Sequence, residues 1–252
     1  MSREGKTDYK IGTPLFEFDS CGSTNDIAKT LAEHNFPEGT SVISDVQTGG
    51  RGRYGRKWIS PDGENIYLSV ILRPKVKPKD ISFFSIMGAC AVSKTIESFS
   101  KGKVEIKWPN DVMIDGKKIS GILSELKIQG TRLDNLVMGI GININSGLKN
   151  LNKKLKKTST SLMLTEGKKV DRATFLAKLF LNLNAFYRFC ARGSKSKTLK
   201  FANNRLFKRN CPVSFSTDGK KISGIIKGID TDGSIKISQN GKTRKFLSGE
   251  II

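Results

Sequence analysis

Residues 107–123, KWPNDVMIDGKKISGIL, decide the fold of this chain. At their centre the pair Asp115-Gly116 separates two apolar runs, and this is the strongest short-range signal for a β-hairpin with a two-residue turn. The turn fixes which residues of the two strands face each other: Ile114 and Lys117, Met113 and Lys118, Val112 and Ile119, Asp111 and Ser120, Asn110 and Gly121.

One face of this hairpin carries polar side chains. Because successive side chains of a strand point to opposite faces, we expect Asp111, Lys118 and Ser120 on the same face, together with Met113. The missing side chain at Gly121 leaves room for a ligand to approach the backbone. The hairpin is therefore predicted to form one wall of a site.

The segments around the hairpin show helix and strand periodicities. Strands are expected within residues 39–47, 65–74 and 135–145, and helices within residues 20–34, 80–100 and 172–189. The expected helix N-caps are Ser23 or Thr24, Asp80 and Asp171. The last helix places Phe175, Leu179, Leu183 and Phe186 on one stripe. Residues 148–170 are rich in lysine and are expected at the surface.

The C-terminal region has a different pattern from the rest of the chain. From about residue 210, short alternating strands are separated by Asp218-Gly219, Asp232-Gly233 and Asn240-Gly241. Such spacing is typical of a small antiparallel barrel. We therefore expect two domains, residues 1–208 and residues 209–252.

Composition limits the class of protein. The chain has 252 residues, with 44 Lys and Arg against 23 Asp and Glu, so its net charge is +21 and its surface will attract anions. Nucleic acid, an anionic small molecule and an acidic protein all fit. Four widely spaced cysteines and one histidine make a protein zinc site improbable. With no signal peptide and no apolar run long enough to span a bilayer, a reduced, soluble, cytoplasmic protein is expected.

The loop GGRGRYGRKW, residues 49–58, is the strongest candidate for anion binding. Glycines allow a tight nest of backbone N–H groups, and the arginines add fixed charge. Read alone, the loop favours a solvated basic turn or a nucleic-acid contact over this reading. No Ser, Cys or His arrangement suggests a nucleophile, and His34 falls in the last turn of a helix, where capping is expected.

Several blocks occur together in one order: GSTN at 22–25, Gln47, GRGRYGRKW at 50–58, KWPND at 107–111, KKISGIL at 117–123 and GIGININ at 139–145. With the small C-terminal barrel, this set resembles the biotin–protein ligases over nearly the whole chain. The resemblance implies an α+β fold: a class II aminoacyl-tRNA-synthetase-like catalytic domain with a mixed β-sheet and helices, then an SH3-like β-barrel.

The resemblance also implies the reaction. Biotin's carboxylate attacks the α-phosphate of ATP, giving biotinyl-5'-AMP and pyrophosphate, and a lysine of a biotin carboxyl carrier protein, such as that of acetyl-CoA carboxylase, then takes the biotin. Mg²⁺ would accompany ATP without a dedicated protein metal site. Bringing two anions together makes charge neutralisation and positioning the central tasks of such an enzyme.

Carried over block by block, the resemblance assigns roles to particular residues of this sequence. The catalytic candidates are Lys118, Arg51 and Arg53. The biotin-binding candidates are Ser23, Thr24, Asn25, Gln47, Arg51, Gly52, Arg53, Lys118 and Gly121. The ATP-binding candidates are Arg53, Arg56, Trp58, Asn110, Asp111 and Asn143. Helix capping by Ser23 and Thr24, and core packing of Trp58, are the structural alternatives.

Two features of the sequence depart from much of that family. Tyr54 stands where a basic residue is common, so we expect one phosphate contact to be missing or to be replaced by a stacking or hydroxyl contact. Only 22 residues precede Ser23, so an enzyme-only form without specific DNA binding is expected. An acidic carrier domain is the expected partner, no membrane is involved, and a homodimer is left open. A lipoate or octanoate ligase and a nucleic-acid binder are the rival hypotheses.

Overall fold

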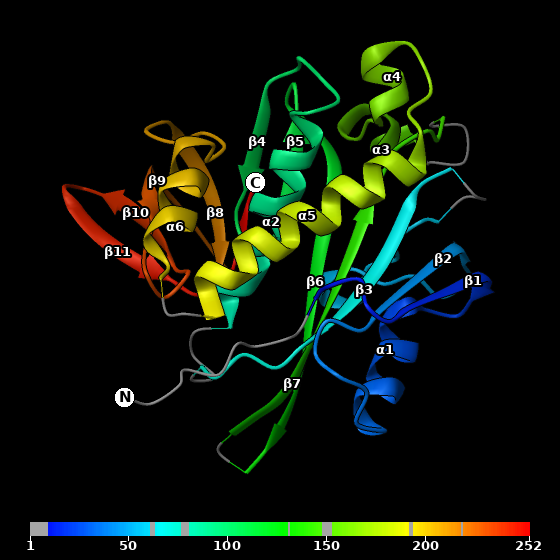
Figure 1. Ribbon diagram of the computed structural model, residues 1–252. Coiled ribbons are helices and arrows are strands. Elements are labelled where there is room, and N and C mark those ends of the chain that lie inside the picture. Colours follow the sequence, from blue (N-terminus) through cyan, green and yellow to red (C-terminus); the bar gives the residue numbers. More distant parts are fainter. Residues whose placement is uncertain are drawn as a thin grey trace.

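The computed structural model describes residues 10–60, 64–76, 81–130, 132–147, 153–191, 194–217 and 219–252. Its centre is a seven-stranded sheet in the order β1-β2-β3-β7-β6-β5-β4 (Figure 1). The strands are β1 Leu15–Cys21, β2 Ser41–Gln47, β3 Ile66–Leu72, β4 Val104–Lys107, β5 Asp111–Ile114, β6 Lys117–Gln129 and β7 Arg132–Ile142. Only β1 and β2 pair in parallel, so the sheet is mixed as expected.

Helices cover both faces of this sheet. The described helices are α1 Thr24–Glu33, α2 Ser82–Ile96, α3 Lys153–Thr158, α4 Leu162–Glu166, α5 Arg172–Ala191 and α6 Ser196–Asn204, with a 3-10 turn, η1 Arg53–Gly55. Alternation along β3 explains the two layers, because Val70 and Leu72 join the main core whereas Ile71 joins a smaller cluster under α1. α5 lies across α2 on the main-core side (Figure 1).

The sequence located most of these elements. Asp171 accepts a hydrogen bond from the Thr174 N–H, as expected of an N-cap, and the buried stripe of α5 continues through Tyr187 rather than Phe186. The expected cap Asp80 lies outside the described residues. Strand β1 was missed because its middle residues are exposed at a sheet edge, which leaves no continuous apolar run.

Residues 148–170 were expected at the surface, but their described part is only partly exposed. It contains the short helices α3 and α4. Between them Ser159, Thr160 and Ser161 are buried, and Ser161 caps α4 by accepting from the Leu164 N–H. The stretch therefore packs against the sheet rather than lying wholly in solvent.

The hairpin register was correct only next to the turn. Ile114 pairs with Lys117 and Met113 with Lys118, but a β-bulge then shifts the register by one residue. Val112 consequently pairs with Ser120 and Asp111 with Gly121. A bulge places two residues of one strand opposite one residue of the other, so the side chains of β6 beyond the bulge point to the opposite faces from those predicted. The prediction that Ser120 shares the site face was wrong, and Gly121 takes that place.

The C-terminal unit is a five-stranded antiparallel sheet in the order β11-β10-β9-β8-β12. Its strands are β8 Pro212–Thr217, β9 Lys220–Ile229, β10 Ile235–Gln239, β11 Lys242–Phe246 and β12 Glu250–Ile251. Strands β11 and β12 form its two edges, so the described residues form an open sheet and not the closed barrel that was expected. The arrangement is consistent with an SH3-like domain.

This unit packs against the hairpin through Trp108. The Trp108 Nε1–H donates to the carbonyl of Gly233 at 2.9 Å, and the indole contacts the ring of Phe215 with centroids 5.8 Å apart. Both aromatic residues belong to the main core. The block that forms the hairpin thus also anchors the C-terminal sheet.

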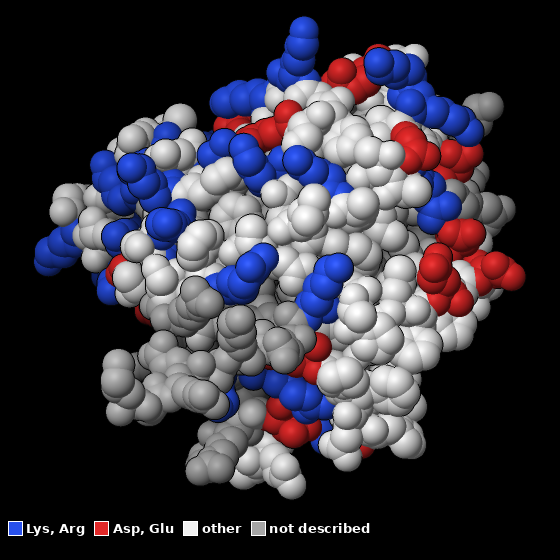
Figure 2. Space-filling model, viewed as in Figure 1, with Lys and Arg blue, Asp and Glu red and all other residues white. Residues whose placement is uncertain are grey.

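Charge is unevenly distributed over the visible surface. Figure 2 shows basic side chains gathered over the C-terminal sheet and α6, and acidic side chains at the opposite side of the view, near β1 and β2. Within the described part of the chain, no helix is long and apolar enough to cross a membrane.

Candidate active site

A cavity of about 630 Å³ lies between the 49–58 loop, the sheet and the C-terminal unit. Strands β5, β6 and β7 form the floor of the cavity. The start of α1 closes one end, and the 49–58 loop covers the cavity. All the site residues expected from the sequence line it: Ser23, Thr24, Asn25, Gln47, Arg51, Gly52, Arg53, Arg56, Trp58, Asn110, Asp111, Lys118, Gly121 and Asn143. The sequence blocks therefore converge on one place.

The 49–58 loop folds as a narrow turn above the cavity. Arg51 and Lys57 form a β-bridge, the Gly52 N–H donates to the Arg56 carbonyl at 2.6 Å, and the Trp58 N–H donates to the Gly50 carbonyl at 3.0 Å. A Cβ at Gly50 would lie 2.6 Å from the Trp58 carbonyl oxygen. A side chain there would collide with the backbone, so this turn requires glycine.

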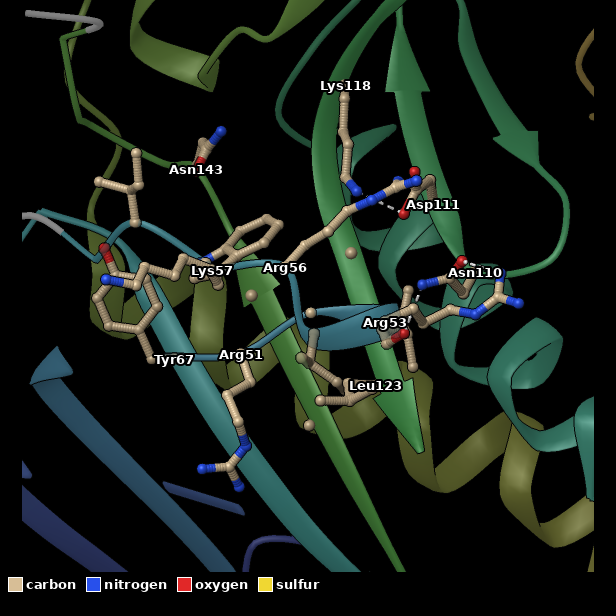
Figure 3. Close-up of a pocket in the computed structure, with 18 of the residues that line it drawn as sticks. Arg51, Arg53, Arg56, Lys57, Tyr67, Asn110, Asp111, Lys118, Leu123 and Asn143 are labelled. Atoms are coloured by element: carbon tan, nitrogen blue, oxygen red, sulfur yellow. Dashed lines mark hydrogen bonds and ion pairs between the residues drawn. The ribbon is translucent and has the colours of Figure 1, made fainter. Parts of the chain in front are cut away.

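Three cationic side chains reach the cavity, Lys118 from β6 and both Arg53 and Arg56 from the 49–58 loop (Figure 3). The Lys118 Nζ lies 2.6 Å from the Asp111 carboxylate and 5.6 Å from the centre of the Trp58 ring. Arg56 donates two hydrogen bonds to Glu250, at 2.9 and 2.6 Å. Arg53 donates to the Asn110 carboxamide oxygen at 3.3 Å. These groups concentrate positive charge where an anionic ligand would sit.

Arg51 is directed away from this group. Figure 3 shows its guanidinium pointing away from Lys118 and Arg53, and it donates two hydrogen bonds to Asp26, at 2.8 and 2.5 Å. Hydrogen bonding by Arg51 is the main reason that the pKa of Asp26 is lowered, and the same contact raises the pKa of Arg51. The structure therefore does not bring the Arg51 guanidinium together with Lys118.

The end of the cavity near α1 is a network of polar groups. Gln47 accepts from the Thr24 N–H at 2.9 Å and from the Thr24 hydroxyl at 3.1 Å. Asn25 donates to Glu125 at 2.6 Å and accepts from the Ser69 hydroxyl at 2.6 Å. Such a network fixes the direction of donors and acceptors that a polar ligand would meet.

Ser23 and Thr24 have little part in capping α1 with their side chains. Ser23 occupies the N-cap position without a side-chain cap hydrogen bond. Thr24 is the first helical residue, and its hydroxyl bonds Gln47 as described above. Both residues are buried in the cavity wall. The capping alternative is therefore wrong for their side chains.

The indole of Trp58 lies on glycines of the sheet. A Cβ at Gly141 would come within 2.5 Å of this ring, and one at Gly121 within 3.1 Å. Trp58 is not a member of either hydrophobic cluster, and its Nε1 is buried with no hydrogen-bond partner among the described residues. It belongs to the cavity rather than to the core.

Several residues of the cavity were missed from the sequence. Lys107 belongs to the KWPND block and its pKa is lowered, chiefly by burial. Glu250 comes from β12, and no local pattern places it beside the 49–58 loop. Two hydrogen-bond partners of the cavity residue Asn25, Ser69 and Glu125, were also missed. Ser69 alternates with the core residues Leu68 and Val70 along β3, so a strand-face argument could have found it. Within the described residues, no cluster of His, Cys, Asp and Glu could hold a metal ion.

Comparison with known proteins decides the family. Residues 17–143 match the family model described as Biotin/lipoate A/B protein ligase family, and residues 210–252 match the Biotin protein ligase C terminal domain. The chain belongs to the biotin/lipoate A/B protein ligase family. The second match covers the open C-terminal sheet.

Relatives of this family resemble the chain over most of its length. The Bifunctional ligase/repressor BirA of Bacillus spizizenii is 39% identical over 247 residues, covering 96% of this chain and 74% of the relative. The Biotin--[acetyl-CoA-carboxylase] ligase of Mycobacterium tuberculosis is 25% identical over 236 residues, covering 92% and 85%. The biotin protein ligase of Aquifex aeolicus, solved in complex with biotin and ATP, is 28% identical with a TM-score of 0.79, covering 94% and 97%.

Proposed function

We propose that this member of the biotin/lipoate A/B protein ligase family is an ATP-dependent biotin–protein ligase that forms AMP. One observation carries the proposal: a single cavity joins a polar pocket at α1 to a cluster of cations under the 49–58 loop. The first feature suits biotin's ureido ring, and the second suits a carboxylate next to a phosphate. Of the relatives described above, one is named a biotin–[acetyl-CoA-carboxylase] ligase and one was solved in complex with biotin and ATP.

The first step joins two anions. A carboxylate oxygen of biotin forms a bond to the α-phosphorus of ATP, and the bond from that phosphorus to the pyrophosphate oxygen breaks. Two unit charges about 4 Å apart repel by roughly 4 kcal/mol at an effective dielectric constant near 20. Lys118 and Arg53 are proposed to offset this repulsion and to stabilise the charge that builds on the phosphate.

The second step transfers biotin to a carrier protein. The neutral amine of a carrier lysine attacks the acyl carbon of biotinyl-5'-AMP, an amide bond forms, AMP leaves and the amine loses a proton. We propose the biotin carboxyl carrier protein as this acceptor. The net charge of +21 is proposed to attract an acidic acceptor domain as well as ATP.

The remaining residues divide along the cavity. Ser23, Thr24, Asn25, Gln47, Gly52 and Gly121 are proposed for biotin, and Arg56, Trp58, Asn110, Asp111 and Asn143 for ATP. Arg51 can take part in two ways. Either its guanidinium leaves Asp26 and reaches the ligand, or only its backbone contacts the ligand. Mg²⁺ would arrive with ATP, held mainly by phosphate oxygens, and Asp111 is proposed as the carboxylate that would meet it.

Three further expectations complete the proposal. Residues 1–208 and 209–252 are proposed as catalytic and C-terminal domains, and the protein is proposed to work in the cytoplasm. Binding to DNA, if measured, is expected to be weak, dependent on salt and indifferent to sequence. Self-association is left to sedimentation experiments.

The deciding experiment is exchange of radiolabelled pyrophosphate into ATP, run in parallel with biotin, lipoate and octanoate. We expect exchange with biotin and little with the two other acids. Equal exchange with lipoate would overturn the substrate assignment, whereas no exchange with any acid would overturn the adenylate chemistry.

A further inference from the structure

Tyr54, at the tip of the 49–58 loop, has an unfavourable backbone conformation for its side chain. Its φ is 58° and its ψ is 35°, in the left-handed region that residues with a Cβ rarely adopt. Its side chain is largely exposed, so hydrophobic burial does not compensate for this. A bulky ring held in this way at the rim of a cavity indicates a specific function.

The ring and hydroxyl of Tyr54 both contact Arg53. The Arg53 Nη2 donates to the Tyr54 hydroxyl at 2.8 Å, and the guanidinium carbon lies 4.7 Å from the ring centre. On its other side, the Arg53 Nη1 donates to Asn110, which in turn donates to the Ile122 carbonyl at 2.7 Å. The guanidinium is thus oriented between a phenol and a carboxamide.

This arrangement distinguishes Arg53 from Arg51, Arg56 and Lys118. Arg51, Arg56 and Lys118 each form an ion pair with a carboxylate of the protein. Within the described residues, Arg53 has no carboxylate at ion-pair distance, and both of its hydrogen bonds go to neutral groups. Neutral partners fix the direction of a guanidinium without neutralising its charge.

We propose that Tyr54 is a positioning residue that holds the Arg53 guanidinium over the cavity with its charge available to a substrate phosphate. This inference rests on the proposed function for the identity of that phosphate. A carboxylate in place of the phenol would compete with the ligand for Arg53, and a second cation would repel it. Tyrosine orients Arg53 without either effect.

The test measures two quantities on the full chain: the Kd of ATP alone, by calorimetry, and the rate at which biotinyl-5'-AMP leaves the enzyme. Tyr54→Leu removes both contacts, and we expect each quantity to rise about tenfold, as for loss of a charge-assisted hydrogen bond. Tyr54→Phe keeps the ring and should show about a threefold rise.

Two controls separate orientation of Arg53 from other roles. Tyr54→Gly suits the left-handed backbone but lacks the ring, so it should behave like Tyr54→Leu if the ring matters. In an Arg53→Ala background, Tyr54→Leu should change the Kd of ATP by less than about twofold, because the two residues act as a unit. A loss of the same size in both backgrounds would show direct contact of Tyr54 with the ligand and overturn the proposal.

Wild-type affinity in Tyr54→Leu or in Tyr54→Gly would also overturn it. Failure of the proposed function has a different signature, since a wild-type enzyme that forms no biotinyl-5'-AMP would refute that function. The Kd of ATP alone needs no reaction and would still decide the role of Tyr54.

Discussion

Arg56 of the 49–58 loop and Glu250 of β12, which are 194 residues apart in the chain, form a two-bond ion pair of 2.9 and 2.6 Å. Glu250 also lines the cavity, so the end of the C-terminal sheet contributes directly to its rim. The hydrogen bond from Arg56 is the main reason that the pKa of Glu250 is lowered. The C-terminal unit thus holds the 49–58 loop over the cavity through this ion pair.

Glu250→Gln should loosen the loop without unfolding the protein. The two side chains are 63% and 38% exposed, so the pair should contribute no more than about 1 kcal/mol to the free energy of unfolding. We expect faster proteolytic cleavage within residues 49–57, and protection of these bonds by biotin with ATP. Glu17→Gln, an exposed change on β1, is the matched control. Equal cleavage in the two variants would show that the ion pair does not restrain the loop.

The same ion pair should depend on pH in one direction. Because the pKa of Glu250 is lowered in the folded state, its contribution is present above the ordinary pKa of a glutamic acid, about 4.3, and is lost as pH falls through the folded value. The difference in unfolding free energy between wild type and Glu250→Gln should therefore be constant above about pH 5 and shrink as the pH falls below the ordinary pKa of a glutamic acid. Urea titrations at several pH values measure it. A difference that grows on acidification would contradict this assignment.

A substitution at Gly141 tests whether the Trp58 ring, which lies on this glycine, contacts the nucleotide. In Gly141→Ala the new methyl group would lie 2.5 Å from the indole, so the ring must move. We expect a changed fluorescence of Trp58 and a Kd of ATP weakened at least about tenfold, as for a steric displacement of a stacking side chain. Subtracting spectra of Trp58→Phe removes the signal of the buried Trp108. Changed emission with an unchanged Kd of ATP would show that Trp58 does not contact the nucleotide.

The hairpin shows which structural features could be predicted from the sequence. The pair Asp115-Gly116 located the turn, and side-chain alternation placed Lys118 beside Asp111, because turn type and strand period are local properties. The bulge beyond Lys118 has no local signature, so the positions of Ser120 and Gly121 were exchanged. In this hairpin the local rules therefore hold for the two pairs next to the turn, and tertiary packing decides the rest.

Long-range contacts could not be predicted from the sequence for a similar reason. The site residues were predicted from ordered blocks, and all of them line one cavity. However, neither Glu250 beside Arg56 nor Asp26 beside Arg51 could be predicted, because such pairs form only when separate segments are folded together. The open edge of the C-terminal sheet was likewise invisible, since spacing of turns does not reveal whether the first and last strands pair.

Lys117 and Lys118 are adjacent in the chain but have different surroundings. Lys118 lines the cavity beside Asp111, whereas Lys117 is exposed and is not part of the cavity wall. Removing a preorganised charge near reacting groups costs about 10²–10³ in rate, while trimming an exposed lysine changes stability by less than about 0.5 kcal/mol. Lys118→Ala should therefore lower single-turnover formation of biotinyl-5'-AMP at least about a hundredfold and leave the fold intact, and Lys117→Ala should keep most of the activity. Because the bulge lies beyond both lysines, it does not alter this expectation. Equal losses in the two variants, with circular dichroism unchanged, would mean that the charge of the strand as a whole, and not the position of Lys118, supports the reaction.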